Sequence, residues 1–145
     1  LRTWILPCLL QSLRQNKNYE YPQKFFEIGG IFTKDLSHHS LAQEAQHLGI
    51  VLTHQKASFT EARQALDYLF RMLELQFVVC EDTLGCFLLG RMGTVFVKDN
   101  DKEISVGFIG EVHPQTLQTF GLEMPVAAVE IDMTKLWEIV RGRLK

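Results

Sequence analysis

Histidine and cysteine are the residue types in this sequence that could hold a metal ion or act as a nucleophile. They are His38, His39, His47, His54, His113, Cys8, Cys80 and Cys86. Adjacent side chains diverge in a helix and face opposite ways in a strand, so His38 and His39 do not converge on one ion. The three cysteines lack zinc-site spacing, and their odd number is typical of reduced thiols in a cytosolic protein. We therefore expect no metal site and no disulfide.

Neither the thiols nor the glycine-rich segment predicts a reaction. Cys8 lies on a leucine-rich stripe and Cys80 ends an apolar run, which is the usual place of an inert buried thiol, and we expect packing for Cys86 as well. The segment GFIGEVHP matches neither the GxGxxG nor the GxxxxGK phosphate loop. Its Glu111 and His113 could act as acid and base, but a glutamate near a helix start and a histidine N-cap explain them structurally.

Composition predicts one soluble domain over residues 1–145. The chain has 145 residues, of which 46% are hydrophobic and 22% are charged, enough to bury a substantial core. Its formal net charge of -2 provides no global basic field for nucleic acid. No apolar run approaches the ~20 residues that span a bilayer, and Pro7 interrupts the stretch that resembles a signal peptide. Because the chain begins with leucine, we expect it to be a piece of a longer protein, and the reduced thiols favour a cytoplasmic location.

Apolar spacing predicts a short helix followed by two strands in the first third of the chain. Pro7 suits a first helical turn, and the stripe that follows it consists of Leu6, Leu9, Leu10 and Leu13. The segment QKFFEIGGIFTKD reads as a strand that is bent or bulged at Gly29 and Gly30. Residues 47–53 read as a second strand, and we expect a surface loop over residues 34–44.

The clearest predicted element is a helix over residues 58–75. Ser58 and Glu61 match a capping box, and apolar residues recur behind them at helical spacing. Arg63, Asp67 and Arg71 follow one another four apart on the opposite face, as ion pairs on a solvated helix surface do.

The remaining segments predict an α+β fold around an antiparallel or mixed sheet. QFVVC reads as a strand, and RMGTVFVKD and EISVGFIGE form a hairpin around residues 99–101. A short helix follows over residues 113–120, with Gly121 as its left-handed end. PVAAVEI then reads as a strand and MTKLWEIV as a final helix. Strands neither alternate strictly with helices nor stand alone, which favours the α+β class.

Four segments in order carry a resemblance to a known family. They are LRTWILPCLLQSLRQNKN, KFFEIGGIF, LLGRMGTVFV and GFIGEVHPQTLQTFGLEMPVAAVEID. Together they resemble the beta subunit of phenylalanyl-tRNA synthetase in its archaeal and eukaryotic form. The match covers nearly the whole chain, and it is the order of the segments that makes it specific.

The resemblance implies a catalytic-like module with a class II synthetase core, an antiparallel sheet flanked by helices. It also implies that this module does no chemistry and holds no cofactor, because ATP and magnesium act in the alpha subunit of such enzymes. The implied partners are the alpha subunit and a second beta subunit in a heterotetramer, with tRNA(Phe) reached through the complex and no membrane.

The resemblance further implies a degenerate ATP site. Class II cores place an arginine after the FEIG strand to hold the ATP α-phosphate, whereas here FEIGGIFTKD puts Thr33 at that position and Asp35 at the following glutamate position. Threonine lacks the charge and the forked donors of arginine. Lys34 should point to the opposite face of the strand. The glycines and arginine of the last class II strand are absent as well, and Lys135 is a poor substitute for them.

In this family the first helix builds subunit contacts. The implied interface residues are Trp4, Ile5, Leu9, Leu10 and Leu13, and the alternative for all five is burial in the core of the domain. Trp4 and Cys8 replace small residues of the family pattern, and Leu89 stands where a proline is common.

Two other functions stay open. An active class II ligase would need Lys34 or Lys135 as an unusual phosphate ligand. A direct tRNA-binding module would need basic and aromatic side chains at either end of the chain. Those side chains are Arg2, Arg14, Lys17, Tyr19 and Tyr21, or Arg141, Arg143 and Lys145.

Overall fold

The computed structural model describes residues 2–34 and 42–144, and in these ranges six antiparallel strands form the sheet at the centre of the fold. The strands are β1 (Gln23–Lys34), β2 (Ala42–Thr53), β3 (Phe77–Glu81), β4 (Phe87–Asp99), β5 (Lys102–Val112) and β6 (Val126–Asp132). They are arranged in the order β1-β2-β6-β5-β4-β3, so the last strand of the chain lies in the middle of the sheet. The predicted α+β class with antiparallel pairing is confirmed.

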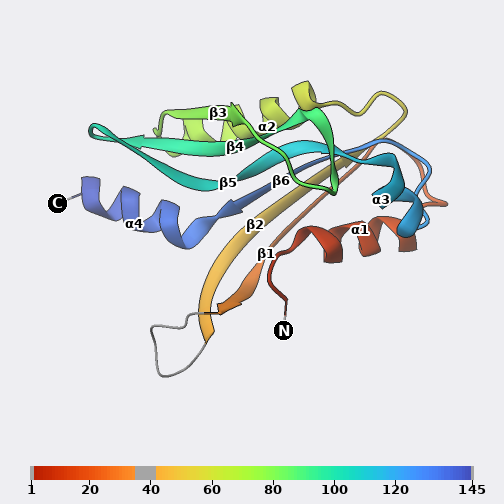
Figure 1. Ribbon diagram of the computed structural model, residues 1–145, viewed down its shortest axis with the longest axis horizontal. Coiled ribbons are helices and arrows are strands. Elements are labelled where there is room, and N and C mark those ends of the chain that lie inside the picture. Colours follow the sequence, from red (N-terminus) through yellow and green to blue (C-terminus); the bar gives the residue numbers. More distant parts are fainter. Residues whose placement is uncertain (1, 35–41, 145) are drawn as a thin grey trace.

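In the described part of the chain, four helices flank this sheet. They are α1 (Leu6–Gln15), α2 (Phe59–Met72), α3 (Pro114–Thr119) and α4 (Met133–Arg143). α1 and α2 lie on opposite sides of the sheet, and α3 lies beside the end of the sheet near α1 (Figure 1). The described residues contain no helix that is both long and apolar enough to cross a membrane.

Each side of the sheet has its own apolar core. On one side, Leu66 and Phe70 of α2 and Leu136 of α4 pack on sheet residues such as Val129 and Ile109. On the other side, the leucine stripe of α1 packs on Val51, Ala128 and Met92 together with Leu117 of α3. Successive residues of β6 therefore point alternately into one core and into the other. This explains why PVAAVEI is apolar on both faces.

The hairpin of β1 and β2 is longer than the sequence predicts. β2 begins at Ala42 rather than at residue 47, so the expected loop over residues 34–44 is partly strand, and its middle, residues 35–41, lies outside the described residues. The predicted bulge at Gly29 and Gly30 is wrong, because both pair in continuous register with β2. The register shifts lie instead between β4 and β5. β1 and β2 curve away together beyond the rest of the sheet (Figure 1).

The helix ends confirm some predicted caps and correct one. His113 accepts a hydrogen bond from the backbone N–H of Gln115, as an N-cap does, and Gly121 has a φ of +70°. Ser58 occupies the N-cap of α2, but its side chain makes no capping hydrogen bond. The capping box is therefore wrong.

The start of α2 is capped from a distant strand instead. Glu61 turns away to His54, with 2.6 Å between Oε1 and Nε2. Glu111 of β5 accepts from the backbone N–H of Phe59 at 3.2 Å and pairs with Arg91 at 3.1 Å. A carboxylate 52 residues away along the chain thus caps the start of α2, where the local sequence predicts a cap from Ser58 and Glu61.

The cysteines differ from the prediction at one position. Cys80 is exposed at the edge strand β3, so it is not the buried thiol that we predicted from its apolar run. An edge strand has one solvated side, which apolar neighbours along the chain do not reveal. Cys8 and Cys86 are partly buried, and burial raises the pKa of the Cys86 thiol.

Candidate functional site

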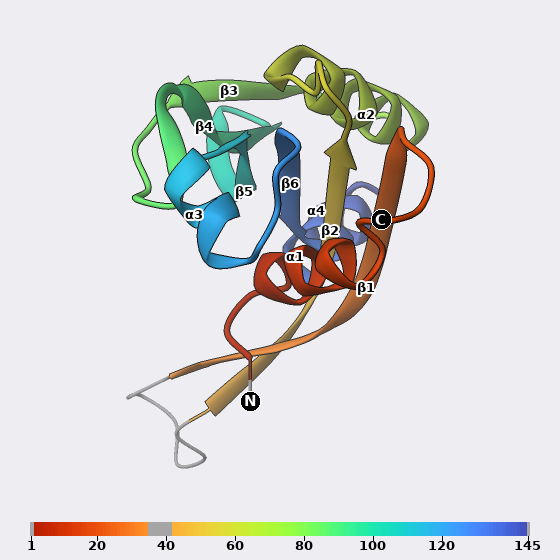
Figure 2. The same cartoon turned by 90° about the vertical axis from the view of Figure 1, so that its right-hand side faces the viewer.

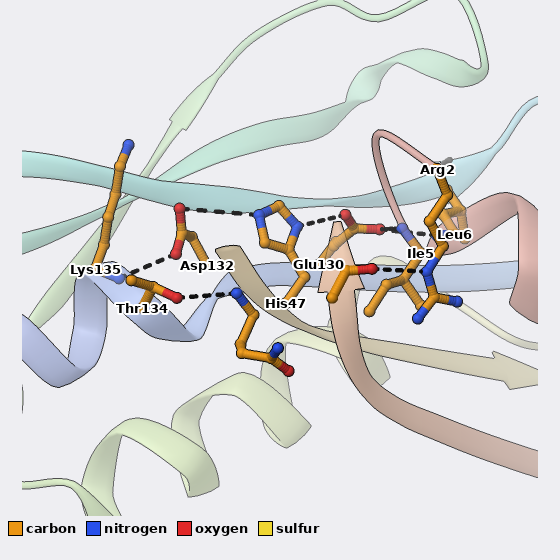
Figure 3. A network of polar contacts seen from close by, with 10 residues as sticks. Arg2, Ile5, Leu6, His47, Glu130, Asp132, Thr134 and Lys135 are labelled. Carbon is orange, nitrogen blue, oxygen red and sulfur yellow. Dashed lines mark hydrogen bonds and ion pairs between the residues drawn. The ribbon is translucent and has the colours of Figure 1, made fainter. Parts of the chain in front are cut away.

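A buried glutamate in the middle of the sheet organises the polar residues of the α1 side. Glu130 lies on β6 with 1% of its surface exposed. Its Oε1 accepts two hydrogen bonds, from the backbone N–H groups of Ile5 and Leu6, each at 2.8 Å (Figure 3). Those two N–H groups belong to the start of α1, where no helical partner exists for them. The glutamate therefore binds the positive end of the helix that covers it.

The second carboxylate oxygen of Glu130 binds a histidine. His47 of β2 donates from Nδ1 to Oε2 over 2.7 Å, since a carboxylate can only accept. The other ring nitrogen, Nε2, lies 3.8 Å from Oδ2 of Asp132. Asp132 stands directly opposite His47 in the pairing of β2 with β6. The imidazole thus bridges two carboxylates of the same strand.

The network continues to the last helix. Asp132 accepts from the backbone N–H of Lys135 at 3.0 Å and so caps α4. Thr134 accepts from the backbone N–H of Gln46 on β2 at 2.9 Å. Figure 3 shows the resulting chain of contacts from the start of α1 through the sheet to the start of α4. These contacts hold the first and last helices on the same pair of strands.

A surface depression of about 310 Å³ adjoins this network, and its lining is acidic. Asp82 and Asp132 contribute carboxylates to it, whereas Lys135 is its one lysine. The hydroxyl of Thr94 donates to Asp82 over 2.6 Å and, with a backbone N–H, lowers the pKa of that carboxyl. Nζ of Lys135 donates to the backbone carbonyl of Ser105 at 3.2 Å. The depression thus sets two carboxylates against one lysine and His47, which is not the cluster of cations that a phosphate site uses.

The predicted phosphate-site positions do not converge on this depression. Thr33 is exposed near the end of β1, opposite Gln43 of β2, and Asp35 lies outside the described residues. Lys34 is also exposed, and as its neighbour along a strand it points to the other face. Neither Thr33 nor Lys34 lines the depression, and Lys135 is its only member of the predicted set.

Most of the predicted interface residues lie inside the domain. Ile5, Leu9, Leu10 and Leu13 are between 0% and 3% exposed, because the three leucines belong to the buried stripe of α1 and Ile5, at its N-cap, joins the same core. Trp4 is partly buried, with its ring edge-on to Phe108 at a centroid distance of 5.8 Å. Core burial, the alternative considered for these residues, describes the packing of all but Trp4.

Several side chains proposed for direct tRNA contact already have protein partners. Arg2 pairs with Glu27 at 2.7 Å and donates to the carbonyl of Gly30. Arg143 donates to the carbonyl of Lys98 at 2.6 Å. These cations stabilise the two ends of the chain against the sheet.

The sequence contains a signal for the buried network that motif searching does not use. Glu130 is an acidic residue within the apolar strand PVAAVEI, and acidic residues are almost never fully buried without a partner. The partner, His47, was considered only as a metal ligand. Within residues 2–34 and 42–144, no group of three or more His, Cys, Asp or Glu side chains could hold a metal ion, and His38 and His39 lie outside those ranges.

Comparison with known proteins assigns the chain to a family. The model of the family described as "Phenylalanyl tRNA synthetase beta chain CLM domain" matches residues 1–133. The chain belongs to this family. Proteins named phenylalanine–tRNA ligase beta subunit also match the chain over most of its length.

The similarity to these beta subunits covers nearly all of this chain but only part of each relative. The protein of Thermococcus sibiricus is 41% identical over 138 residues, which are 95% of this chain and 24% of the relative. That of Pyrococcus abyssi is 39% identical over 95% of this chain and 24% of the relative. That of Thermofilum pendens is 35% identical over 99% and 25%. The CLM domain chain thus spans about a quarter of the length of these curated relatives.

Proposed function

We propose that this chain is a non-catalytic structural and subunit-interaction module of phenylalanine–tRNA ligase, which attaches phenylalanine to tRNA(Phe) at the expense of ATP in translation. The family match over residues 1–133 supports the enzyme. In this proposal the chain works in the cytoplasm as part of a beta subunit. Its partners are the alpha subunit, which holds ATP and magnesium, and a second beta subunit, and tRNA is reached through the assembly.

The occupied carboxylate of Glu130 is the observation that carries the non-catalytic assignment. A class II synthetase core, the finer fold that we propose for this sheet, needs an open sheet face with cations aimed at a nucleotide. Here the start of α1 and His47 occupy both oxygens of the central carboxylate. The neighbouring depression is acidic, and its lysine is already bonded to a carbonyl. The face thus favours a fixed helix over a bound phosphate.

Calorimetric titration with ATP and magnesium tests the non-catalytic assignment. We expect no saturable heat at millimolar nucleotide. Saturable binding that Lys34→Ala or Lys135→Ala abolishes would instead support an active ligase domain. Lys98→Ala, which removes an exposed lysine of β4, serves as the matched control because it lies outside the depression.

Light scattering of the chain mixed with the cognate alpha subunit tests the interaction role. We expect a stoichiometric complex by light scattering, with a mass that corresponds to one copy of each chain or a multiple of that pair. A folded chain that stays alone at micromolar concentrations of both proteins would contradict the role.

A further inference from the structure

Five large apolar side chains are exposed on one side of the sheet, and together we call them the β1 apolar face. They are Phe26, Ile28, Tyr68, Met72 and Trp137, between 59% and 73% exposed. Three separate elements supply them, namely β1, α2 and α4. Single exposed apolar residues are ordinary, but aromatic residues gathered from three elements mark an interaction surface.

Register places the two β1 residues on the side of α2 and α4. Phe26 stands opposite Ile50, which packs against the core beneath those helices. Between Phe26 and Ile28, Glu27 stands opposite Gly49, and a side chain on Gly49 would meet α1 on the other side. Since alternate strand residues share a face, Phe26 and Ile28 both point to the side that α1 does not cover.

The phase of α2 brings two more residues toward β1. Arg63 on one flank lies over an aromatic ring of β3, at the far edge of the sheet. Glu61 on the opposite flank pairs with His54 at the end of β2. Tyr68 and Met72 follow Glu61 by seven and eleven residues, which places them within about 20° of it around the helix. Both therefore lie on the flank that faces β2 and β1.

The helical phase of α4 likewise places Trp137 on the flank that faces β2 and β1. Lys135 reaches the carbonyl of Ser105 on β5 from one flank of this helix. Thr134 accepts from Gln46 of β2 on the other flank. Trp137 is one turn after Thr134, so it belongs to the flank that faces β2. β1 is the next strand outward from β2.

The uncovered strip on this side is the edge strand β1. On this side, α2 and α4 pack on the core of β2, β6 and β5, and no described residue of the edge strand β1 (Figure 2) belongs to that core. Neighbouring strands are about 4.8 Å apart and a helix with its side chains is about 10 Å across, so a helix laid over β1 covers the full width of that strand. An amphipathic helix laid over β1 would contact α2 and α4 on its flank.

We propose that the β1 apolar face is the docking surface for the companion alpha subunit, which places an amphipathic helix on it. This inference rests on the proposed function. Aromatic residues and Met are enriched in the cores of stable subunit interfaces, whereas contacts between domains of one chain are more polar. At the exposure stated above, the three aromatic rings alone offer roughly 400 Å² of surface. That is about half of what one partner buries in a standard interface.

The test is the affinity of the cognate alpha subunit for wild-type chain and for two variants. Phe26→Asp places a charge on the β1 part of the face, and we expect binding to weaken at least tenfold. Leu89→Asp is the matched control, because Leu89 is 81% exposed on β4 in a different depression, beside His113. Its affinity should stay within twofold of wild type. Circular dichroism melting of each variant shows whether the fold is intact, and Ile28→Ser provides a milder second variant.

Each contrary result has a distinct meaning. If wild type binds the alpha subunit and both Phe26→Asp and Ile28→Ser bind equally well, the docking surface is elsewhere and the inference is wrong while the proposed function stands. If wild type does not bind, the proposed function fails and the inference fails with it. If wild type alone forms a dimer that Phe26→Asp dissociates, the face takes a second copy of this chain and the inference is overturned.

Discussion

The carboxylate of Glu130 on β6 and the imidazole of His47 on the neighbouring strand β2 lie 2.7 Å apart. With one oxygen on this ring and the other on the start of α1, Glu130 is a buried acid whose partners all come from distant segments. Removing one member of such an arrangement leaves the others buried without partners, which costs more than the contact itself contributes.

Replacement of Glu130 by alanine should therefore destabilise the domain strongly. We expect Glu130→Ala to lower the free energy of unfolding by about 3–5 kcal/mol, because the N–H groups of Ile5 and Leu6 and the ring of His47 lose their acceptor. Urea unfolding followed by circular dichroism measures this change. Glu103→Ala, at an exposed position of β5, should stay within about 0.5 kcal/mol of wild type. Equal midpoints for the two variants would contradict the buried network.

The close approach of α1 to β2 predicts a steric effect at Gly49. A Cβ at this position would lie 2.7 Å from Cδ1 of Leu9 and 2.8 Å from Cγ2 of Ile5. Gly49→Ala should therefore push α1 away and cost about 1–3 kcal/mol by thermal or urea unfolding. Gly85→Ala, where a Cβ would meet nothing within 4 Å, is the control and should change stability little. A neutral Gly49→Ala would mean that α1 is not seated as described.

The thiols of Cys80 and Cys86 should differ in their rate of alkylation. Cys80 is exposed, whereas burial raises the pKa of Cys86 and lowers the fraction of reactive thiolate there. Iodoacetamide at pH 8, followed by peptide mass spectrometry, should modify Cys80 several-fold faster than Cys86. In denaturant the two rates should converge. Faster labelling of Cys86 than of Cys80 in the folded chain would contradict the exposed position of Cys80 on β3 and the partial burial of Cys86.

Acid should weaken the hydrogen bond between Asp82 and Thr94 of β4. The hydrogen bonds from Thr94 and Thr83 lower the pKa of Asp82 below its ordinary value of 3.8. A lowered folded-state pKa means that Asp82 stabilises the fold above the unfolded-state pKa and that this contribution disappears as pH falls through the folded-state pKa. Asp82→Asn should therefore be slightly less stable than wild type at pH 6, and the difference should vanish in strong acid. Asp101→Asn, on an exposed turn, is the control variant.

The order and type of the elements could be predicted from the sequence because local patterns determine them. The leucine stripe after Pro7 and the apolar spacing behind Ser58 gave α1 and α2, and Gly121 ends α3 at a φ of +70° as predicted. Local capping failed where a distant residue supplied a better acceptor, as Glu111 does for α2. Propensity along the chain contains no information about such a partner.

The candidate site depends on contacts that sequence spacing cannot supply. Glu130 and Ile5 are 125 residues apart, and their meeting depends on which strand occupies the middle of the sheet. The same holds for the β1 apolar face, since Phe26 and Ile28 are apolar residues of a predicted strand and nothing along the chain marks them as exposed. Helix phase and sheet order, rather than residue type, leave these two side chains exposed.

The central position of β6 has a consequence for synthesis on the ribosome. β1 with β2, and β3 with β4 and β5, can each pair locally as soon as they emerge, but the two halves are joined only by the strand that comes last. Until then, the inner edges of β2 and β5 expose unpaired backbone groups, and α1 has no glutamate to hold its first turn. Nascent chains that end before Val126 should therefore be the species that chaperones hold and proteases remove.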